Sequence, residues 1–147
     1  MCDLYPGSHF ASGEFSGSLA DIAWPLKIDN LMASKLSVSG MVKRYNEKTG
    51  NNTDGYAFFE RIGTDEDVDQ VLTEMCAKTA AYLYNLQSVL DVERTAIGGV
   101  SEQPALLKRI KEHYHRLYTG PFPLPCHEAE IVKCAFGNDS NLIGALY

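Results

Sequence analysis

Basic residues, long apolar runs and paired cysteines are all scarce in this sequence of 147 residues. Thirteen Lys and Arg stand against nineteen Asp and Glu, which leaves a formal net charge of −6. Because a nucleic-acid backbone is held by Lys and Arg that neutralise its phosphates, this balance argues against direct nucleic-acid binding. No apolar run approaches the roughly 20 residues of a membrane-spanning helix, so no membrane partner is expected. The composition is typical of one soluble globular domain.

The first seven residues also lack the basic start and apolar stretch of a secretion signal, which predicts a cytoplasmic protein. The four cysteines, Cys2, Cys76, Cys126 and Cys134, include no C-x-x-C pair, and free thiols are the default in such a chain. The alternative is a metal cluster of Cys126, His127 and Cys134, but this spacing fits no common zinc template. No metal site is predicted, and Cys76 and Cys134 are interpreted as small core residues.

Apolar residues at the three- and four-residue spacing of a helix predict four main helices. They are one helix from after Ser34 to Gly50, a short helix over 56–62, a long helix over 66–90, and a helix opened by Glu102-Gln103-Pro104 with the proline in its first turn. Thr64 or Asp65 is expected to cap the long helix. A last short helix is predicted over 141–147, with Asp139 acting as a cap rather than as a catalytic group.

Two short strands, over 94–98 and 129–135, are separated by the helix that Pro104 opens. This order predicts parallel pairing with a right-handed crossover, and therefore an α/β protein. Sheets usually have about four to six strands, so two strands cannot cover these helices. We expect the chain to be part of a larger domain whose exposed apolar surface binds a second copy, as a homodimer, or a missing N-terminal half.

Two glycine-rich segments are candidate binding elements. Gly98 and Gly99 follow the first strand and precede a helix, where a flat ligand or a phosphate can lie against the backbone; tight strand–helix packing explains the pair equally well. Residues 1–24 are rich in Gly and Ser around Glu14, which suits close approach to a ligand but also an ordinary surface loop. Glu128 and Glu130 flank a strand and are expected to face solvent.

Three motifs together resemble one protein family. They are the segment Leu4–Phe15, the run from Asn85 to Asp91 followed by Ile97-Gly98-Gly99-Val100-Ser101, and the ending Gly137-Asn138-Asp139 with Leu142-Ile143-Gly144-Ala145. In this order they resemble the C-terminal half of the ROK family of repressors, open reading frames and sugar kinases. The resemblance implies an incomplete ribonuclease-H-like domain of the actin-like ATPase superfamily, with a mixed sheet and several flanking helices. Residues 1–147 would form this C-terminal domain, with a sugar-site loop region over 1–24 and a helix-strand-helix-strand-helix core over 34–147.

The resemblance also implies a function and its binding residues. Family members phosphorylate hexoses or related sugars with ATP and Mg²⁺, or sense sugars when joined to a DNA-binding element. Glu14 matches the family's Glu that hydrogen-bonds sugar hydroxyls, a task that suits a carboxylate. Gly98 and Gly99 match the glycine turn that faces the adenine nucleoside. The implied partners are therefore a hexose-like sugar and ATP.

Several family features are missing from this chain. Gly17 stands where the family often has a sugar- and zinc-contacting His, the zinc-binding cysteine loop is absent, and the usual three-glycine turn is reduced to Gly98-Gly99. No structural zinc is predicted. The phosphate loop and the catalytic Asp belong to the N-terminal half, so no catalytic residue is assigned and the chain alone is expected to be an inactive kinase. The alternatives are the sugar-sensing domain of a transcriptional regulator and a non-catalytic truncated paralogue; the missing zinc cysteines favour the kinase.

Overall fold

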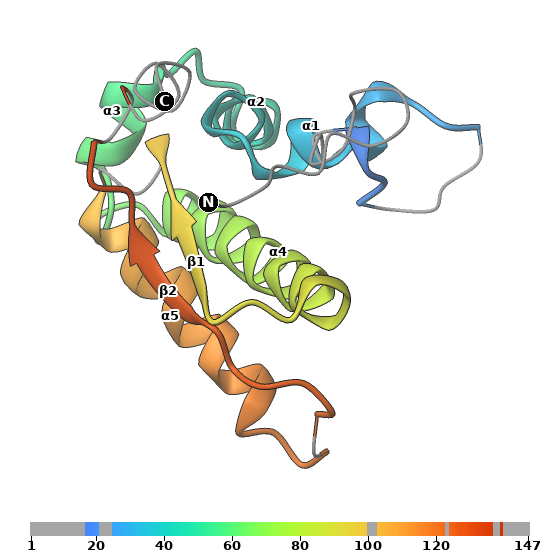
Figure 1. Cartoon of the computed structure of the whole chain (residues 1–147). Helices are drawn as coiled ribbons and strands as arrows, with labels where there is room; N and C mark the ends of the chain where they lie inside the picture. Colours follow the sequence, from blue (N-terminus) through green and yellow to red (C-terminus); the bar gives the residue numbers. More distant parts are fainter. Residues whose placement is uncertain (1–16, 21–24, 100–102, 123, 137–138, 140–147) are drawn as a thin grey trace.

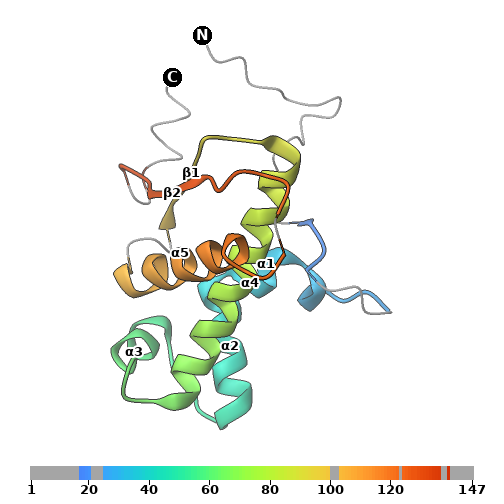
Figure 2. The ribbon, with the colours of Figure 1, turned by 90° about the horizontal axis from the view of Figure 1, so that it is seen from below.

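The computed structural model of the chain describes residues 17–20, 25–99, 103–122, 124–136 and 139. Its elements, in chain order, are the 3-10 helix η2 (Ile28–Asn30), α1 (Met32–Leu36), α2 (Val38–Thr49), α3 (Gly55–Glu60), α4 (Glu66–Leu90), β1 (Arg94–Ile97), α5 (Pro104–Tyr118) and β2 (Glu130–Lys133). Figures 1 and 2 show β1 and β2 side by side next to α5, with α4 crossing α5 and with α2 and α3 near the start of α4. This part of the chain is a helical body that carries one small sheet.

The long helix α4 agrees with the predicted segment 66–90 at both ends. Asp65 is its N-cap, and the Asp65 carboxylate accepts hydrogen bonds from the backbone N–H of Asp67 at 3.0 Å and of Val68 at 3.3 Å. The same carboxylate accepts a bond from the Tyr45 hydroxyl at 2.8 Å. This hydroxyl, followed by the backbone donors, lowers the pKa of Asp65 and ties the start of α4 to α2.

The helix predicted after Ser34 and ended by Gly50 is confirmed as α2, with Gly50 as its left-handed C-cap, but it begins later than predicted because the backbone is extended at Ser37 and separates α1 from α2. The Ser37 hydroxyl caps α2 by accepting from the backbone N–H of Gly40 at 3.1 Å. The guanidinium of Arg44 donates to the carbonyl oxygens of Ser34 at 3.3 Å and of Lys35 at 3.1 Å. These bonds satisfy backbone groups at the end of α1 and the start of α2.

The strands β1 and β2 form a parallel pair in which Arg94 lies opposite Glu130. This confirms the pairing predicted from the strand-helix-strand order. Both strands are shorter than the predicted segments 94–98 and 129–135, and the second ends early because the chain turns at residues 135–136.

The expected mixed sheet is not formed by the described residues, in which the sheet has two parallel strands. The antiparallel pairing that they do contain is an isolated bridge between Leu19 and Leu31, outside the named strands. The predicted helix over 141–147 lies outside the described residues.

Side chains from α2, α3, α4, α5 and β2 form one apolar core. Its buried members are Met41, Tyr45, Phe58, Val68, Val71, Leu72, Met75, Cys76, Ala80, Leu106, Ile110, Tyr114 and Ile131. Burial raises the pKa of the Cys76 thiol to about 11, which keeps it protonated at neutral pH and confirms the predicted core role. Cys134 differs from its prediction, because it follows β2 rather than lying within it and is half-buried.

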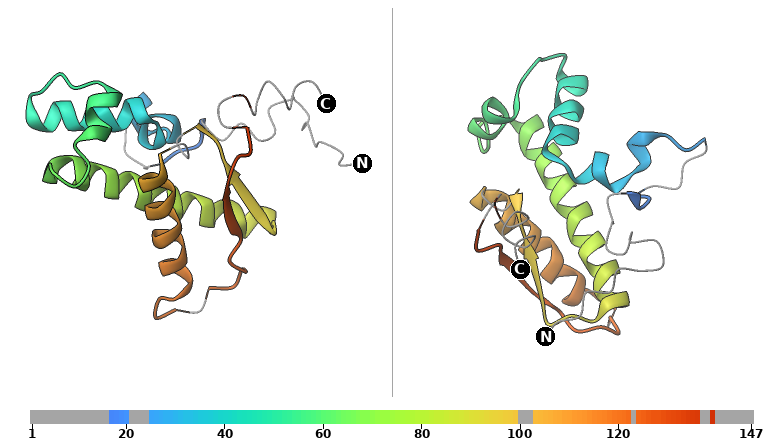
Figure 3. Two further views of the ribbon diagram at one scale, coloured as in Figure 1. Left: turned by 90° about the vertical axis from the view of Figure 1, so that its left-hand side faces the viewer. Right: turned by 45° about the horizontal axis from the view of Figure 1, so that its top comes forward.

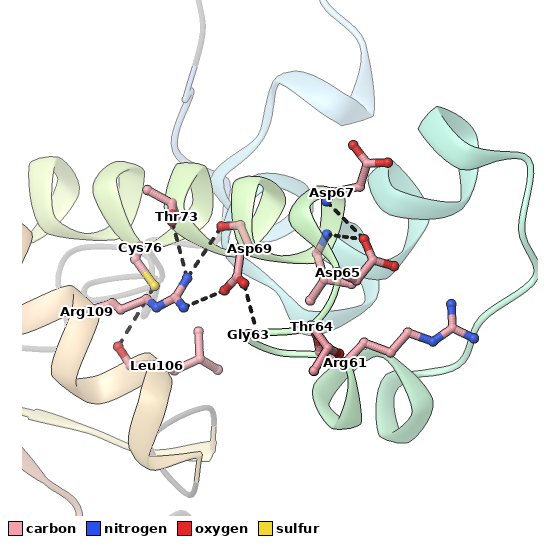
Figure 4. A network of polar contacts seen from close by, with 11 residues as sticks. Arg61, Gly63, Thr64, Asp65, Asp67, Asp69, Thr73, Cys76, Leu106 and Arg109 are labelled. Atoms are coloured by element: carbon pink, nitrogen blue, oxygen red, sulfur yellow. Dashed lines mark hydrogen bonds and ion pairs between the residues drawn. The ribbon is translucent and has the colours of Figure 1, made fainter.

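A polar network joins α4 to α5 and to the turn before α4 (Figure 4). The guanidinium of Arg109 donates to the Asp69 carboxylate at 2.5 Å and to the Thr73 hydroxyl at 3.3 Å. The other oxygen of that carboxylate accepts from the backbone N–H of Gly63 at 2.9 Å. Asp69 therefore connects three segments of the helical body that positions the sheet.

Candidate functional site at the carboxyl edge of the sheet

The carboxyl ends of both strands lie at one edge of the sheet, because the strands are parallel. Figures 1 and 3 show the two chain segments leaving this edge near one another. The backbone N–H of Cys134 donates to the carbonyl oxygen of Ile97 at 2.9 Å, so the exit of β2 is bonded to the last residue of β1. In open α/β sheets, ligands bind outside the carboxyl ends of the strands. This edge is therefore the candidate site.

Gly98 and Gly99 lie at this edge, directly after β1. Gly98 is half-buried and Gly99 is exposed. The backbone of Gly99 has φ +59°, which falls in the left-handed region where a side chain is disfavoured. The second glycine is thus required by the turn itself, and the turn presents a backbone surface without side chains.

Phe136 lies at the same edge, two residues after the Cys134 bond. Its side chain is 59% exposed, and its carbonyl oxygen accepts from the backbone N–H of Asp139 at 3.0 Å. Sequence reasoning did not single out Phe136. The sequence feature that could have indicated it is an aromatic residue directly after the predicted strand 129–135, where a turn places the residue outside the core.

The two glutamates near β2 lie at the other end of the strand, and each contacts the side chain of a histidine or an arginine. Both carboxylate oxygens of Glu128 lie 3.1 Å from Nδ1 of His115. Glu130 accepts from the Arg94 guanidinium at 2.7 Å. Neither carboxylate is at the candidate edge, and both Glu128 and Glu130 are exposed as predicted. Glu14, the predicted sugar ligand, lies outside the described residues.

Cys126 has hydroxyl neighbours. Its sulfur lies 3.7 Å from the Ser88 hydroxyl and 3.9 Å from the Tyr118 hydroxyl. Burial raises the pKa of this thiol, but hydrogen bonds from Ser88, Tyr84 and Tyr118 outweigh that effect and lower it.

Within the ranges that the structure describes, no three His, Cys, Asp or Glu residues are grouped as a metal site would need. None of the described helices is long and apolar enough to cross a membrane.

A sequence profile of the ROK family matches residues 32–147 of this chain. The chain belongs to the ROK family. This confirms the membership predicted from the glycine motifs, and the match covers both strands, α5 and the Gly98–Gly99 turn. A comparison with curated proteins gave no match.

Solved structures of ROK proteins share the fold of this chain. A ROK family protein from Streptococcus pneumoniae TIGR4, solved in complex with sucrose, is 24% identical with a TM-score of 0.84 over 98% of this chain and 50% of that chain. A ROK hexokinase from Thermus thermophilus is 14% identical, with a TM-score of 0.80 over 96% of this chain and 48% of that chain. A ROK glucokinase from Streptomyces griseus, in complex with glucose and AMPPNP, is 20% identical, with a TM-score of 0.66 over 79% of this chain and 43% of that chain.

This ROK chain spans about half the length of the solved structures that it matches. The architecture is therefore part of the actin-like ATPase fold that these proteins have. Its helix-dominated body and small parallel sheet agree with an incomplete α/β unit.

Proposed function

We propose that this ROK chain is the C-terminal half of an ATP-dependent kinase that phosphorylates a hexose-like sugar. The observation that carries the proposal is the Gly98–Gly99 turn, which lies at the carboxyl edge of a parallel pair within the matched segment 32–147. The similar proteins of known structure include a hexokinase and a glucokinase bound to glucose and AMPPNP. These names support a sugar and a nucleotide as the ligands of the complete site.

The binding roles are divided between two segments in this proposal. Glu14 accepts hydrogen bonds from sugar hydroxyls, and the Gly98–Gly99 turn faces the adenine nucleoside of ATP. The turn fits that role because Gly99 is exposed and has no side chain to block a flat base. Mg²⁺ is proposed as the companion of ATP, as in the family, and the described residues contain no group of three His, Cys, Asp or Glu that could hold a metal ion.

The missing half would also complete the sheet. Parallel sheets are normally covered on both faces, whereas Arg94 and Ala96 of β1 and Glu130 of β2 are exposed. Ile131 and Ile97 on the opposite face belong to the core or pack against it. The exposed face supports contact with an N-terminal half, and a second copy of the chain is the other proposed occupant.

The chain alone is expected to show no sugar-dependent consumption of ATP above background. Phosphoryl transfer depends on positioning and charge stabilisation of the phosphates, and the phosphate loop and base belong to the other half in this family. A coupled assay of ADP release, with glucose as the sugar and an intact hexokinase as positive control, measures this directly. Glucose-dependent turnover by the purified chain would contradict the assignment of the catalytic parts to the missing half.

Replacing Glu14 with glutamine is expected to weaken glucose binding about tenfold, because a hydrogen bond to a charged group contributes roughly 1.5–3 kcal/mol. Titration calorimetry with glucose measures the change. The matched control is Glu60→Gln, which makes the same change at an exposed residue of α3 and should leave binding unchanged. Equal affinities of the wild-type chain and Glu14→Gln would remove the sugar role from Glu14.

A further inference from the structure

Cys126 lies where three segments of the helical body meet. It belongs to the connection between α5 and β2, and Figures 2 and 3 show this connection returning past the C-terminal end of α4. Its sulfur lies 3.7 Å from the hydroxyl of Ser88 on α4 and 3.9 Å from the hydroxyl of Tyr118, the last residue of α5. The thiol is free and half-buried. The sulfur is therefore held by its neighbours and still within reach of a small molecule.

Two tyrosines of α5 direct a hydrogen bond at this sulfur. The hydroxyls of Tyr114 and Tyr118 lie 3.0 Å apart, and each hydroxyl has one hydrogen to donate. When Tyr114 donates to Tyr118, the hydrogen of Tyr118 is left for Cys126. Burial, followed by the hydroxyl of Tyr114 and by Cys126 itself, raises the pKa of Tyr118. Tyr118 therefore keeps its hydrogen when the thiol ionises.

These hydroxyls favour the thiolate form of Cys126. Burial raises the pKa of the thiol, but hydrogen bonds from Ser88, Tyr84 and Tyr118 bring it below its ordinary value. The thiol of Cys76 is the opposite case, because it is fully buried and its pKa is raised to about 11. Since the thiolate is the nucleophilic form of cysteine, the structure gives the two thiols different reactivities.

A cavity of about 420 Å³ lies beside the Cys126 thiol. Asp91 supplies the one carboxylate among its lining residues, and the whole chain has a formal net charge of −6. A reagent with a positive charge is therefore attracted to the thiol more strongly than one with a negative charge. The lining residues come from the end of α4 and from the segment before β2: Gln87, Ser88, Asp91, Pro125, Cys126 and His127.

We propose that Cys126 is a modification site that undergoes thiol–disulfide exchange with small disulfides carrying an amino group. The thiolate sulfur attacks one sulfur of the small disulfide, whose S–S bond breaks as a new S–S bond to Cys126 forms. The other half leaves as a thiolate and takes up the proton that the Cys126 thiol released. The small disulfide is the oxidant, so Cys126 is oxidised, one half of the reagent is reduced to a free thiol, and no further reactant is needed. This reaction is independent of the proposed kinase function.

The probe for the test is cystamine, a small disulfide with two amino groups. The full chain is treated with it at neutral pH, and mass spectrometry of the peptides follows each cysteine separately. Cys126 is expected to react about tenfold faster than Cys134, which is also half-buried but lies after β2, because the thiolate is the reactive form. Cys76 should stay unmodified, which reports that the chain remains folded. If Cys134 reacted as fast as Cys126 while Cys76 stayed protected, the proposal would be overturned.

Tyr118→Phe separates the effect of the hydroxyl from simple exposure of the thiol. It removes the hydroxyl but keeps the ring, which packs against Tyr84 and Tyr114. Loss of the donor raises the pKa of the thiol, and the stronger nucleophilicity of the remaining thiolate offsets this only in part, so Cys126 should react with cystamine about three- to tenfold more slowly. The matched control, Tyr56→Phe, removes a hydroxyl from an exposed residue of α3 and should leave the rate unchanged. Equal rates for Tyr118→Phe and the wild-type chain would contradict activation of Cys126 by this hydroxyl.

Dithiodiglycolate, a small disulfide with two carboxylates, tests the preference for an amino group. Each rate is divided by the rate of the same disulfide with 2-mercaptoethanol, a neutral thiol, which removes differences in intrinsic reactivity. Cystamine should then react with Cys126 about fivefold faster than dithiodiglycolate. Asp91→Asn should narrow this difference, and asparagine suits the left-handed backbone at this position, where φ is 46°. Glu93→Gln, at an exposed carboxylate outside the cavity lining, should leave it unchanged. Equal corrected rates of the two disulfides with the wild-type chain would overturn the amino-group preference.

Discussion

Phe58→Ala is expected to lower the free energy of unfolding by about 3–5 kcal/mol, because truncation of a buried aromatic side chain loses apolar burial and leaves a cavity. Phe58 is fully buried. Its ring packs edge-on against Tyr45 at a centroid distance of 5.3 Å and against Phe59 at 5.8 Å. It thereby anchors α3 to the core beside α2, and urea denaturation of the two proteins measures the loss.

The control for this prediction is Tyr56→Ala, in the same short helix. Tyr56 is 87% exposed, so its truncation should change the free energy of unfolding by no more than about 0.5 kcal/mol. If the two alanine variants unfolded at the same urea concentration, the packing of α3 against the core would be refuted.

Gly40→Ala is expected to lower the free energy of unfolding by about 2–3 kcal/mol, although alanine is the better helix former. A Cβ atom at this position would lie 1.8 Å from the carbonyl oxygen of Ser34 and 2.9 Å from its carbonyl carbon. These are backbone atoms of α1, which cannot rotate away as a side chain can. The helix α1 would have to move off α2, and the bonds from Arg44 to Ser34 and Lys35 would be strained or lost.

Gly55→Ala supplies the matched comparison for this variant. A Cβ atom on Gly55 would meet the Val38 side chain at 3.6 Å, which is an ordinary van der Waals contact. This variant should therefore be as stable as the wild-type chain, or slightly more stable, in thermal unfolding followed by circular dichroism. If Gly40→Ala had the same unfolding temperature as Gly55→Ala, α1 and α2 would not pack as closely as described.

The local elements with strong sequence signals were predicted closely. The helix α4 matches its prediction at both ends, since a long amphipathic pattern is preceded by a capping carboxylate, Asp65. The helix α5 begins within the predicted opening Glu102-Gln103-Pro104, with the proline in its first turn as expected. The family and the glycine turn were predicted from motifs contiguous in the chain.

The break at Ser37 could not be predicted from periodicity, because the apolar repeat begins at Val38 and does not show where the helix before it ends. The break depends on Gly40, which lets α1 approach, and on Arg44, which satisfies the carbonyls of α1. These are contacts between groups on either side of the break, and an apolar repeat carries no information about them. The sugar role of Glu14 stays a prediction.

The amino-acid sequence alone was enough to predict the extent of α4, the start of α5, the parallel pairing of the two strands and membership of the ROK family. The meeting of the two strand exits, where Cys134 bonds to Ile97 directly before the Gly98–Gly99 turn, was decided by the folded chain. It arises from pairing between β1 and β2, which are separated along the chain by the whole of α5. Local spacing encodes the faces of helices and strands, whereas the choice of neighbours at a sheet edge depends on how the helices between them pack.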